Sequence, residues 1–277
     1  SLGAGRLNAM SDLDVIVIYD PDGVDMSDGP RPLATRPYYA RLTQALITAL
    51  TAPMAQGRLY EVDMRLRPSG TQGPVATSWT SFTHYQRNDA WIWEHLALTR
   101  ARPVAGSPDL MADIEAFRRD IMATPRSRAD VLAAVADMRA RIAAAKIPTS
   151  IWDAKTGAGR LLDIELMAQT GALLAGLAAR DVPAGLQGTV ATGWLDVADA
   201  TALARCYDLC WSVQTATRAL SGKTIAAGQV GEAAAAFLCR TTGLASLAEV
   251  ETALTTTYAT AAKIIAAAMP QEVLDDG

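Results

Sequence analysis

The sequence is poor in the residues that build disulfide frameworks, zinc sites and basic nucleic-acid grooves. It holds three Cys and two His in 277 residues, and its 25 Lys and Arg are outnumbered by 29 Asp and Glu. Three cysteines give no paired framework, and a net charge of −4 argues against a nucleic-acid polymerase. No secretory signal and no bilayer-spanning apolar run is seen. We therefore expect a cytoplasmic protein with neither a nucleic-acid nor a membrane partner.

Phe is also scarce, with three residues, whereas half of all residues are hydrophobic. Frequent Ala and rare Phe favour closely packed helices with small side chains, and the length allows one large or two ordinary domains. Cys206 and Cys210 are one helical turn apart. With only His84 and His95 as further ligands, a buried structural role for these cysteines is expected rather than zinc binding.

Two acids separated by one residue introduce an apolar run near the start of the chain. Residues 15–19 are β-branched and aromatic, which predicts a buried strand. Residues i and i+2 of a strand point to the same side, so Asp12 and Asp14 are expected to project together. Two adjacent carboxylates repel unless a cation lies between them, and oxygen ligands suit magnesium. The alternative is a solvated turn at the end of a strand.

A second stretch, residues 58–66, alternates between apolar and charged side chains. Its two faces carry Tyr60, Val62, Met64 and Leu66 on one side and Glu61, Asp63, Arg65 and, continuing the pattern, Arg67 on the other. If this strand pairs with the first one, Asp63 becomes a third carboxylate beside the first two. Three acids, nearby arginines and the turn around Gly3 would make a phosphoryl or nucleotidyl transfer site. The alternative is an exposed face of salt bridges, each contributing about 0.2–1 kcal/mol.

Helical periodicity appears between and after these stretches. A polar loop at residues 20–37 precedes an amphipathic helix at residues 38–50. The apolar face of that helix carries Leu42, Leu46, Ala49 and Leu50. A short strand at residues 75–77 precedes an aromatic-rich helix at residues 81–98. Its aromatic residues, which we expect to pack in the core, are Phe82, Tyr85, Trp91 and Trp93.

We predict a domain boundary between residues 105 and 106. Just before it, Arg100 and Arg102 either reach a phosphate or cap the end of the preceding helix. Just after it, the Ser-Pro-Asp sequence at residues 107–109 is typical of a helix start. Nearly all of residues 106–277 then has helical periodicity, including a capping box formed by Ser246 and Glu249. The second half is therefore expected to be a helical bundle.

A polar segment, residues 152–165, interrupts this helical half. Lys155 and two glycines precede a helix start, and helix N-termini favour anions. Within that helix, Glu165 has apolar neighbours, so an unpaired carboxylate there would be costly. We expect Glu165 either to pair with an arginine or to contribute to a site.

Several stretches of this chain occur together and in the same order in one known family. They are residues 2–8 with 11–14, residues 60–70, residues 85–87 with 90–95, residues 97–102, and residues 153–155 with 163–165. Over its first 180 residues or so, the chain thus resembles bacterial glutamine synthetase adenylyltransferases, of the DNA polymerase β-like nucleotidyltransferase superfamily. Members have two related halves, of which the N-terminal one removes AMP by phosphorolysis and the C-terminal one adds it from ATP. The Trp-Ile-Trp-Glu-His sequence at residues 91–95 looks like the adenylylating half.

The resemblance implies an α+β fold. A small mixed β-sheet nucleotidyltransferase domain, polymerase β-like, is expected at residues 1–105, without its first strand, and an all-α helical bundle at residues 106–277. The implied reaction is transfer of AMP from ATP to a tyrosine hydroxyl of glutamine synthetase with release of pyrophosphate, which controls nitrogen assimilation. Glutamine synthetase and a PII-type signalling protein are the implied partners.

The resemblance also implies roles for individual residues. The catalytic and metal-binding residues are Asp12, Asp14 and Asp63, which would hold two Mg²⁺ ions. The nucleotide-binding residues are Gly3, Ser11, Arg65, Arg67 and Lys155, the two arginines being inferred from strand alternation. The supporting residues are Glu61, Glu94, Arg100, Arg102, Asp163 and Glu165.

The chain departs from the family pattern at two positions. Ala4 and Arg6 stand where the family usually has Gly and Glu. Two alternative functions therefore stay open beside adenylyl transfer. One is phosphorolytic removal of AMP from adenylylated glutamine synthetase, and the other is a non-catalytic regulatory half that binds glutamine synthetase or a small signalling protein. The fold alone would also allow a small-molecule substrate.

Overall fold

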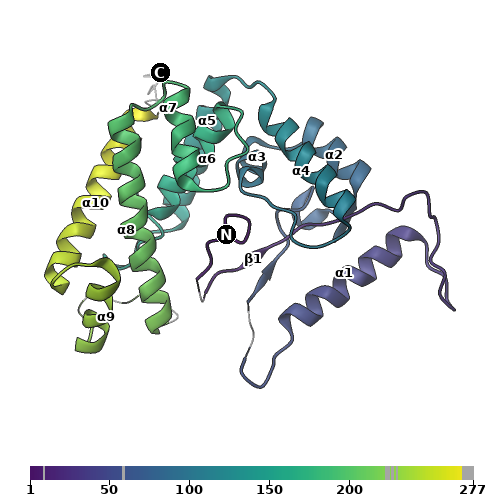
Figure 1. The fold of residues 1–277 in the computed structure, drawn as a ribbon, viewed down its shortest axis with the longest axis horizontal. Helices are drawn as coiled ribbons and strands as arrows, with labels where there is room; N and C mark the ends of the chain where they lie inside the picture. Colours follow the sequence, from purple (N-terminus) through teal and green to yellow (C-terminus); the bar gives the residue numbers. More distant parts are fainter. Residues whose placement is uncertain (9, 58–59, 222–224, 226–227, 229, 270–277) are drawn as a thin grey trace. The chain divides into compact units, whose positions relative to one another are not determined.

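The fold is seen in a computed structural model that describes residues 1–8, 10–57, 60–221, 225, 228 and 230–269 (Figure 1). The chain divides into two compact units. The first is Ser1–Ala97 with Ala101–Ile121, and the second is Leu98–Arg100 with Met122–Gly277. Sheet and helices combine in the first unit and the second is helical, so the predicted α+β class is confirmed. Arg58 and Leu59, which open the predicted charged strand, lie outside the described residues.

The strands of the first unit are short and form two parallel pairs. They are β1 (Leu13–Asp14) with β3 (Val62–Asp63), and β2 (Val17–Tyr19) with β4 (Ala76–Ser78). Antiparallel pairing occurs as isolated bridges, Met26 with Ala34 and Met54 with Gly57. The strand predicted at residues 75–77 is thus confirmed with a shift of one residue.

The buried strand predicted at residues 15–19 is wrong in its extent and burial. The chain changes its pairing partner at residues 15–16: the Val15 N–H still donates to the Asp63 carbonyl (2.9 Å), whereas β2 pairs with β4. Tyr19 is buried and stacks on Tyr39 with 4.2 Å between ring centroids, but Val17 is half-buried. Because the apolar run is divided between two strand pairs, its side chains are less buried than those of a single central strand would be.

The charged strand predicted at residues 58–66 is also shorter than expected. β3 ends at Asp63, and the chain then turns, with the Arg67 N–H donating to the Met64 carbonyl (3.3 Å) and the Gly70 N–H to the Arg67 carbonyl (2.8 Å). Pro68 has no N–H to continue a strand ladder. Arg65 and Arg67 therefore lie in a turn, and strand alternation does not determine where their side chains point.

Helix α1 (Thr35–Thr51) confirms the predicted helix at residues 38–50 but not the burial of its apolar stripe. Leu42 and Leu46 are 51% and 45% exposed, and the buried residue of this helix is Thr43. The helix contacts β3 and β4 through another face. Helical periodicity places apolar side chains on one side but does not determine what covers them.

Further helices follow in the first unit. These are η1 (Gly70–Gln72), α2 (Trp79–Asn88), α3 (Ile92–Thr99), whose last residues fall in the second unit, and most of α4 (Pro108–Ala123). Phe82 is buried against Trp79 and Phe117, with ring centroids 6.2 and 6.1 Å away. Because Phe117 joins this cluster, α4 lies mainly in the first unit, although it follows the predicted boundary. The expectation of core packing is wrong for Trp91 and Trp93, which are 68% and 42% exposed.

The second unit consists of helices with closely approaching backbones. They are α5 (Arg128–Ala145), α6 (Leu161–Leu174), α7 (Val182–Ala191), α8 (Val197–Ser221), α9 (Glu232–Thr242) and α10 (Leu247–Ala268). The predicted capping box is confirmed, because the Glu249 N–H donates to Ser246 Oγ (3.2 Å). Cys206 and Cys210 are buried free thiols in α8, as expected, and burial raises the pKa of Cys210 to about 12. Within the described residues, we find no helix with the length and apolarity to cross a bilayer.

Candidate active site

The register of the β1–β3 pair brings two of the predicted catalytic acids side by side. The Leu13 N–H donates to the Glu61 carbonyl (2.8 Å), and this register sets Asp14 opposite Asp63. Paired residues of neighbouring strands project from the same side of a sheet, and Asp12, two residues before Asp14, belongs to that side as well. The structure therefore contains the strand pairing that places Asp63 beside Asp14.

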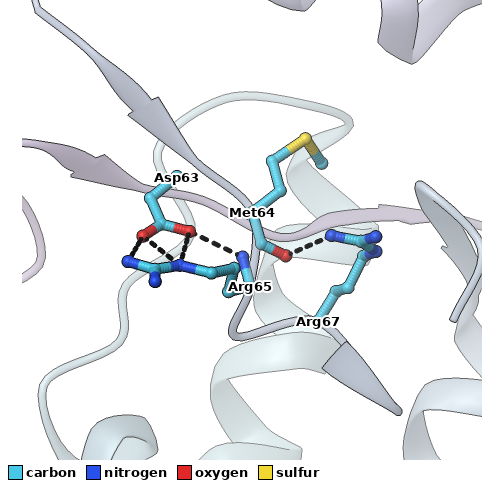
Figure 2. Close-up of polar contacts among 4 residues, drawn as sticks. All are labelled: Asp63, Met64, Arg65 and Arg67. Atoms are coloured by element: carbon cyan, nitrogen blue, oxygen red, sulfur yellow. Dashed lines mark hydrogen bonds and ion pairs between the residues drawn. The ribbon is translucent and has the colours of Figure 1, made fainter. Parts of the chain in front are cut away.

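The carboxylate of Asp63 is occupied by Arg65 (Figure 2). Arg65 Nε lies 3.0 Å from Oδ1 and 2.8 Å from Oδ2, Nη2 also contacts Oδ2, and the Arg65 backbone N–H donates to Oδ1 (2.8 Å). The hydrogen bonds from the Arg65 side chain lower the pKa of Asp63 below its ordinary value, against a smaller opposing effect of burial. Asp63 is thus held ionised by a residue two positions further along the chain.

Arg65 also lies in the electrostatic field of the other two acids. Its pKa is raised first by the hydrogen bond and charge of Asp63 and further by the charges of Asp14 and Asp12. The side chain of Arg65 is 76% exposed, whereas that of Asp63 is 16% exposed. The exposed guanidinium of Arg65 therefore lies within the electrostatic influence of all three carboxylates.

The fit of these residues to magnesium rests on their chemistry and backbone register. All three side chains offer oxygen ligands, which Mg²⁺ prefers. In the part of the chain that the structure describes, however, no three His, Cys, Asp or Glu side chains converge closely enough to hold a metal ion. Asp63 instead points its oxygens at Arg65. The backbone register brings Asp14 and Asp63 opposite each other, whereas the described side chains do not converge on a metal position.

Arg67 closes the turn that follows β3. Its Nη1 donates to the Met64 carbonyl (2.8 Å; Figure 2). Its Nε donates to the Gly73 carbonyl (3.2 Å) and its Nη2 to the Thr71 carbonyl (3.4 Å). This arrangement satisfies carbonyl groups that a strand ladder no longer reaches. Sequence reasoning missed the turn that contains Pro68. The carbonyl groups of this turn need a hydrogen-bond donor, and Arg67 supplies it.

The N-terminal turn and Ser11 are held by local hydrogen bonds. The Gly5 N–H donates to the Leu2 carbonyl (3.1 Å), and the same carbonyl accepts from Arg102 Nη2 (3.3 Å). Ser11 Oγ accepts the Asn8 N–H (2.9 Å). These contacts give Ser11 and Arg102 structural roles in the approach to β1. Gly3 lies in this turn. Glu61 directly precedes β3, and its side chain is exposed.

Glu94 is a buried acid whose role sequence reasoning did not identify. Its Oε2 accepts the backbone N–H of Trp91 (2.9 Å), and both of its oxygens lie 3.1 Å from the Tyr85 hydroxyl, which donates to them. The carboxylate satisfies an otherwise unbonded N–H at the start of α3 and ties that helix to α2. Burial raises the pKa of Glu94, and these two hydrogen bonds oppose the shift. The sequence signal was the spacing of three residues between Trp91 and Glu94.

This burial leads to a pH prediction for Glu94→Gln. Because the folded state holds the Glu94 proton to higher pH than the unfolded state does, its contribution to the free energy of unfolding is complete below about pH 4.3. That contribution is lost as pH rises through the raised pKa. Gln keeps an oxygen for Trp91 and Tyr85 but does not titrate. Urea unfolding from pH 4 to pH 7 should therefore show a smaller loss of stability for the variant than for wild type. Identical pH profiles would contradict this role.

In the second unit, Asp163 and Glu165 pair with different arginines. Arg139 Nε and Nη2 bind the two oxygens of Asp163 at 2.6 and 3.0 Å, and the Gly159 N–H donates to Asp163 Oδ2 (2.9 Å). Arg100 Nη1 lies 3.5 Å from Glu165 Oε2. The arginine-pairing alternative for Glu165 is thus the observed one, and the same contact occupies Arg100.

Lys155 lies exposed on the loop before α6. The first amides of that helix are already bonded, because the Leu161 N–H donates to the Ala154 carbonyl (3.0 Å) and the Leu162 N–H to the Lys155 carbonyl (3.1 Å). These two N–H groups therefore donate to carbonyl groups of the loop and not to an incoming anion. A nucleotide contact here would use the Lys155 side chain.

Comparison with known proteins identifies the first part of the chain. The family model described as glutamate-ammonia ligase adenylyltransferase matches residues 1–117. Residues 1–117 are thus similar to this family. The match includes β1, β3 and the Asp14–Asp63 register. The resemblance found in the sequence is confirmed.

Curated relatives extend the similarity beyond residue 117. A protein of Brucella suis biovar 1 (strain 1330) is 52% identical over 169 residues, and one of Rhizobium meliloti (strain 1021) is 51% identical over 175 residues. Both are named bifunctional glutamine synthetase adenylyltransferase/adenylyl-removing enzyme. The matches cover 61% and 63% of this chain but 17% and 18% of the relatives. The chain thus spans less than a fifth of the length of these relatives.

Proposed function

We propose that this chain is a nucleotidyltransferase part of a glutamine synthetase adenylyltransferase. It would transfer AMP from ATP to a tyrosine hydroxyl of glutamine synthetase and release pyrophosphate. The observation that carries this proposal is the pairing of Asp14 with Asp63 across β1 and β3, inside the segment that matches the adenylyltransferase family.

In this proposal, Asp12, Asp14 and Asp63 are the ligands for two Mg²⁺ ions. When bound, magnesium would stabilise negative charge on the phosphates of ATP. The residues of the chain contribute position and charge: the β1–β3 register fixes Asp14 and Asp63, and the low pKa of Asp63 keeps its carboxylate ionised at neutral pH. Gly3, Ser11 and Lys155 stay proposed nucleotide contacts.

The other predicted site residues make contacts within their own units. Arg67 closes the turn after β3, and Glu94 fixes the start of α3. Asp163 and Glu165 pair with arginines in the second unit. We propose glutamine synthetase as the protein substrate, because the names of the relatives contain it. A PII-type signalling protein as regulator and a cytoplasmic location are proposed with it.

The proposal is tested by incubating the chain with purified glutamine synthetase, Mg²⁺ and ATP labelled in its α-phosphate. We expect label on a tyrosine of glutamine synthetase, and none with the double variant Asp12→Asn/Asp14→Asn. The double variant must give the same circular dichroism spectrum as wild type. Equal labelling by the two proteins would remove the acid pair from the reaction.

The names of the relatives also include adenylyl removal, so removal is the second candidate. The same chain is incubated with adenylylated glutamine synthetase and inorganic phosphate. Release of ADP from this mixture, without labelling in the first assay, would favour the phosphorolytic activity. Neither reaction, from a chain that also fails to bind ATP with Mg²⁺, would favour a non-catalytic regulatory part.

A further inference from the structure

Helix α1 presents a row of apolar side chains to solvent. Tyr38, Leu42, Leu46 and Leu50 recur at every fourth residue, so they follow one side of the helix. They are between 38% and 51% exposed, and Met54, just beyond the helix, is 72% exposed. Single exposed apolar residues are normal, whereas a row of them marks an interaction surface. We call these five residues the α1 stripe.

Another side of α1 holds the helix in place. Thr43 is buried, and Tyr39 stacks on Tyr19 with 4.2 Å between ring centroids. The helix contacts β3 and β4, and at its first residue the Thr35 N–H donates to the Asp25 carbonyl (3.0 Å). The α1 stripe is therefore carried by a helix that is already packed on its own unit, so a partner can bind it without first ordering it.

The charges around the α1 stripe all have the same sign. The charged residues of the segment 29–57 are Arg31, Arg36 and Arg41, and all three are exposed. Asp and Glu do not occur in this segment of the sequence, although the whole chain has a net charge of −4. The last acid of the preceding loop is Asp28. The segment is therefore complementary to a partner whose apolar side chains are flanked by acids.

Two other kinds of occupant match these charges less well. A helix that binds a membrane surface carries many cations on its polar face, whereas α1 has two, Arg36 and Arg41. Its exposed polar residues also include the uncharged Gln44 and Thr48. A second copy of the chain, packed stripe against stripe, would bring further arginines and no acid from residues 29–57.

We propose that the α1 stripe is a docking surface for an acidic amphipathic helix of a partner protein. Apolar side chains of such a helix, spaced three and four residues apart, would pack between those of the stripe and supply most of the affinity. Acids beside them would pair with Arg36 and Arg41, which favours this partner over a basic one and speeds its association. This inference goes beyond the proposed nucleotidyl transfer and does not depend on it.

The test measures binding of a fluorescent designed peptide to the full 277-residue chain by fluorescence anisotropy. The peptide is about 20 residues long, enough to form a helix, with Leu three and four residues apart and Glu beside them. We expect saturable binding that Leu42→Ser/Leu46→Ser weakens at least about tenfold, because two anchors of the stripe are lost. Ile147→Ser/Val197→Ser is the matched control, since these residues of the second unit are 78% and 67% exposed. Its affinity should equal that of wild type.

A second peptide, with Lys in place of every Glu, tests the charge of the partner. It should bind wild type at least about tenfold more weakly than the Glu peptide, because it meets like charge. The variant Arg36→Gln/Arg41→Gln should lose this preference. This variant also keeps the inference falsifiable if circular dichroism shows that the leucine variant has changed its fold.

Several results would overturn the inference. They include no binding of the Glu peptide to wild type, equal binding by wild type and a folded Leu42→Ser/Leu46→Ser variant, and equal or tighter binding of the Lys peptide. Binding to anionic phospholipid vesicles in place of the Glu peptide would make the stripe a membrane surface. Dimers in analytical ultracentrifugation that the leucine variant abolishes, without peptide binding, would make it an interface between copies. Either result would replace the acidic helix as the occupant.

Discussion

Replacing Asp63 with Asn is expected to reduce AMP transfer to glutamine synthetase at least about a hundredfold, a typical cost of removing one electrostatic group at a transition state. Asn keeps the size of the side chain and one oxygen for Arg65, so β3 should stay paired with β1. It loses the negative charge that a divalent ion needs. The measurement is the initial rate of label transfer from ATP at saturating Mg²⁺.

The matched control for this prediction is Asp113→Asn. Asp113 is exposed on α4, outside the β1–β3 pair, and the substitution makes the same chemical change. Its transfer rate should equal that of wild type. If Asp63→Asn keeps its circular dichroism spectrum and transfers AMP at the wild-type rate, Asp63 is not part of the metal site. Loss of the spectrum would instead make Asp63 a folding residue.

Adding a single methyl group at Gly185 is expected to destabilise the second unit by about 1–3 kcal/mol or more, the usual cost of overpacking. A Cβ at Gly185 would lie 2.4 Å from the Ala168 carbonyl oxygen of α6. The same contact is tight along its length, since a Cβ at Gly188 would lie 2.5 Å from the carbonyl oxygen of Gly171. Helices α6 and α7 must therefore separate to admit any side chain.

Thermal unfolding followed by circular dichroism measures this effect in Gly185→Ala. At roughly 2–4 °C per kcal/mol for a unit of this size, the midpoint should fall by several degrees. Gly231→Ala is the control, because a Cβ there meets no atom within 4 Å and the change costs less than about 1 kcal/mol. Equal midpoints for the two variants would show that α6 and α7 move apart more easily than their contact suggests.

One feature that the sequence predicted correctly depends on neighbours in the chain. The capping box of Ser246 and Glu249 forms because donor and acceptor lie three residues apart at a helix start. The approach of Asp63 to Asp14 was expected only if the two strands pair, and the β1–β3 register meets that condition. Pairing with an arginine was one of two alternatives for Glu165, because burying a charge alone is costly. The observed partner, Arg100, is far away in sequence.

The features that it predicted wrongly depend on where elements end and what covers them. Alternation placed Arg65 and Arg67 on one strand face, but the turn around Pro68 ends that strand at Asp63. One arginine then returns to Asp63 and the other holds carbonyl groups of the turn. The exposure of Trp91 and of Leu42 likewise contradicts expectation, because periodicity reports that a face is apolar without supplying a partner for it.

By itself, the sequence determined the α+β class and the helical character of the second half, because these follow from local patterns of apolar and charged residues. Only the tertiary structure decided that Arg65 binds Asp63 and that Arg139 binds Asp163 across 24 residues. It also decided that α6 and α7 pack closely at glycine positions. The physical reason is that a charged or small side chain has many compatible partners in the sequence. Backbone geometry in three dimensions brings one of them within reach.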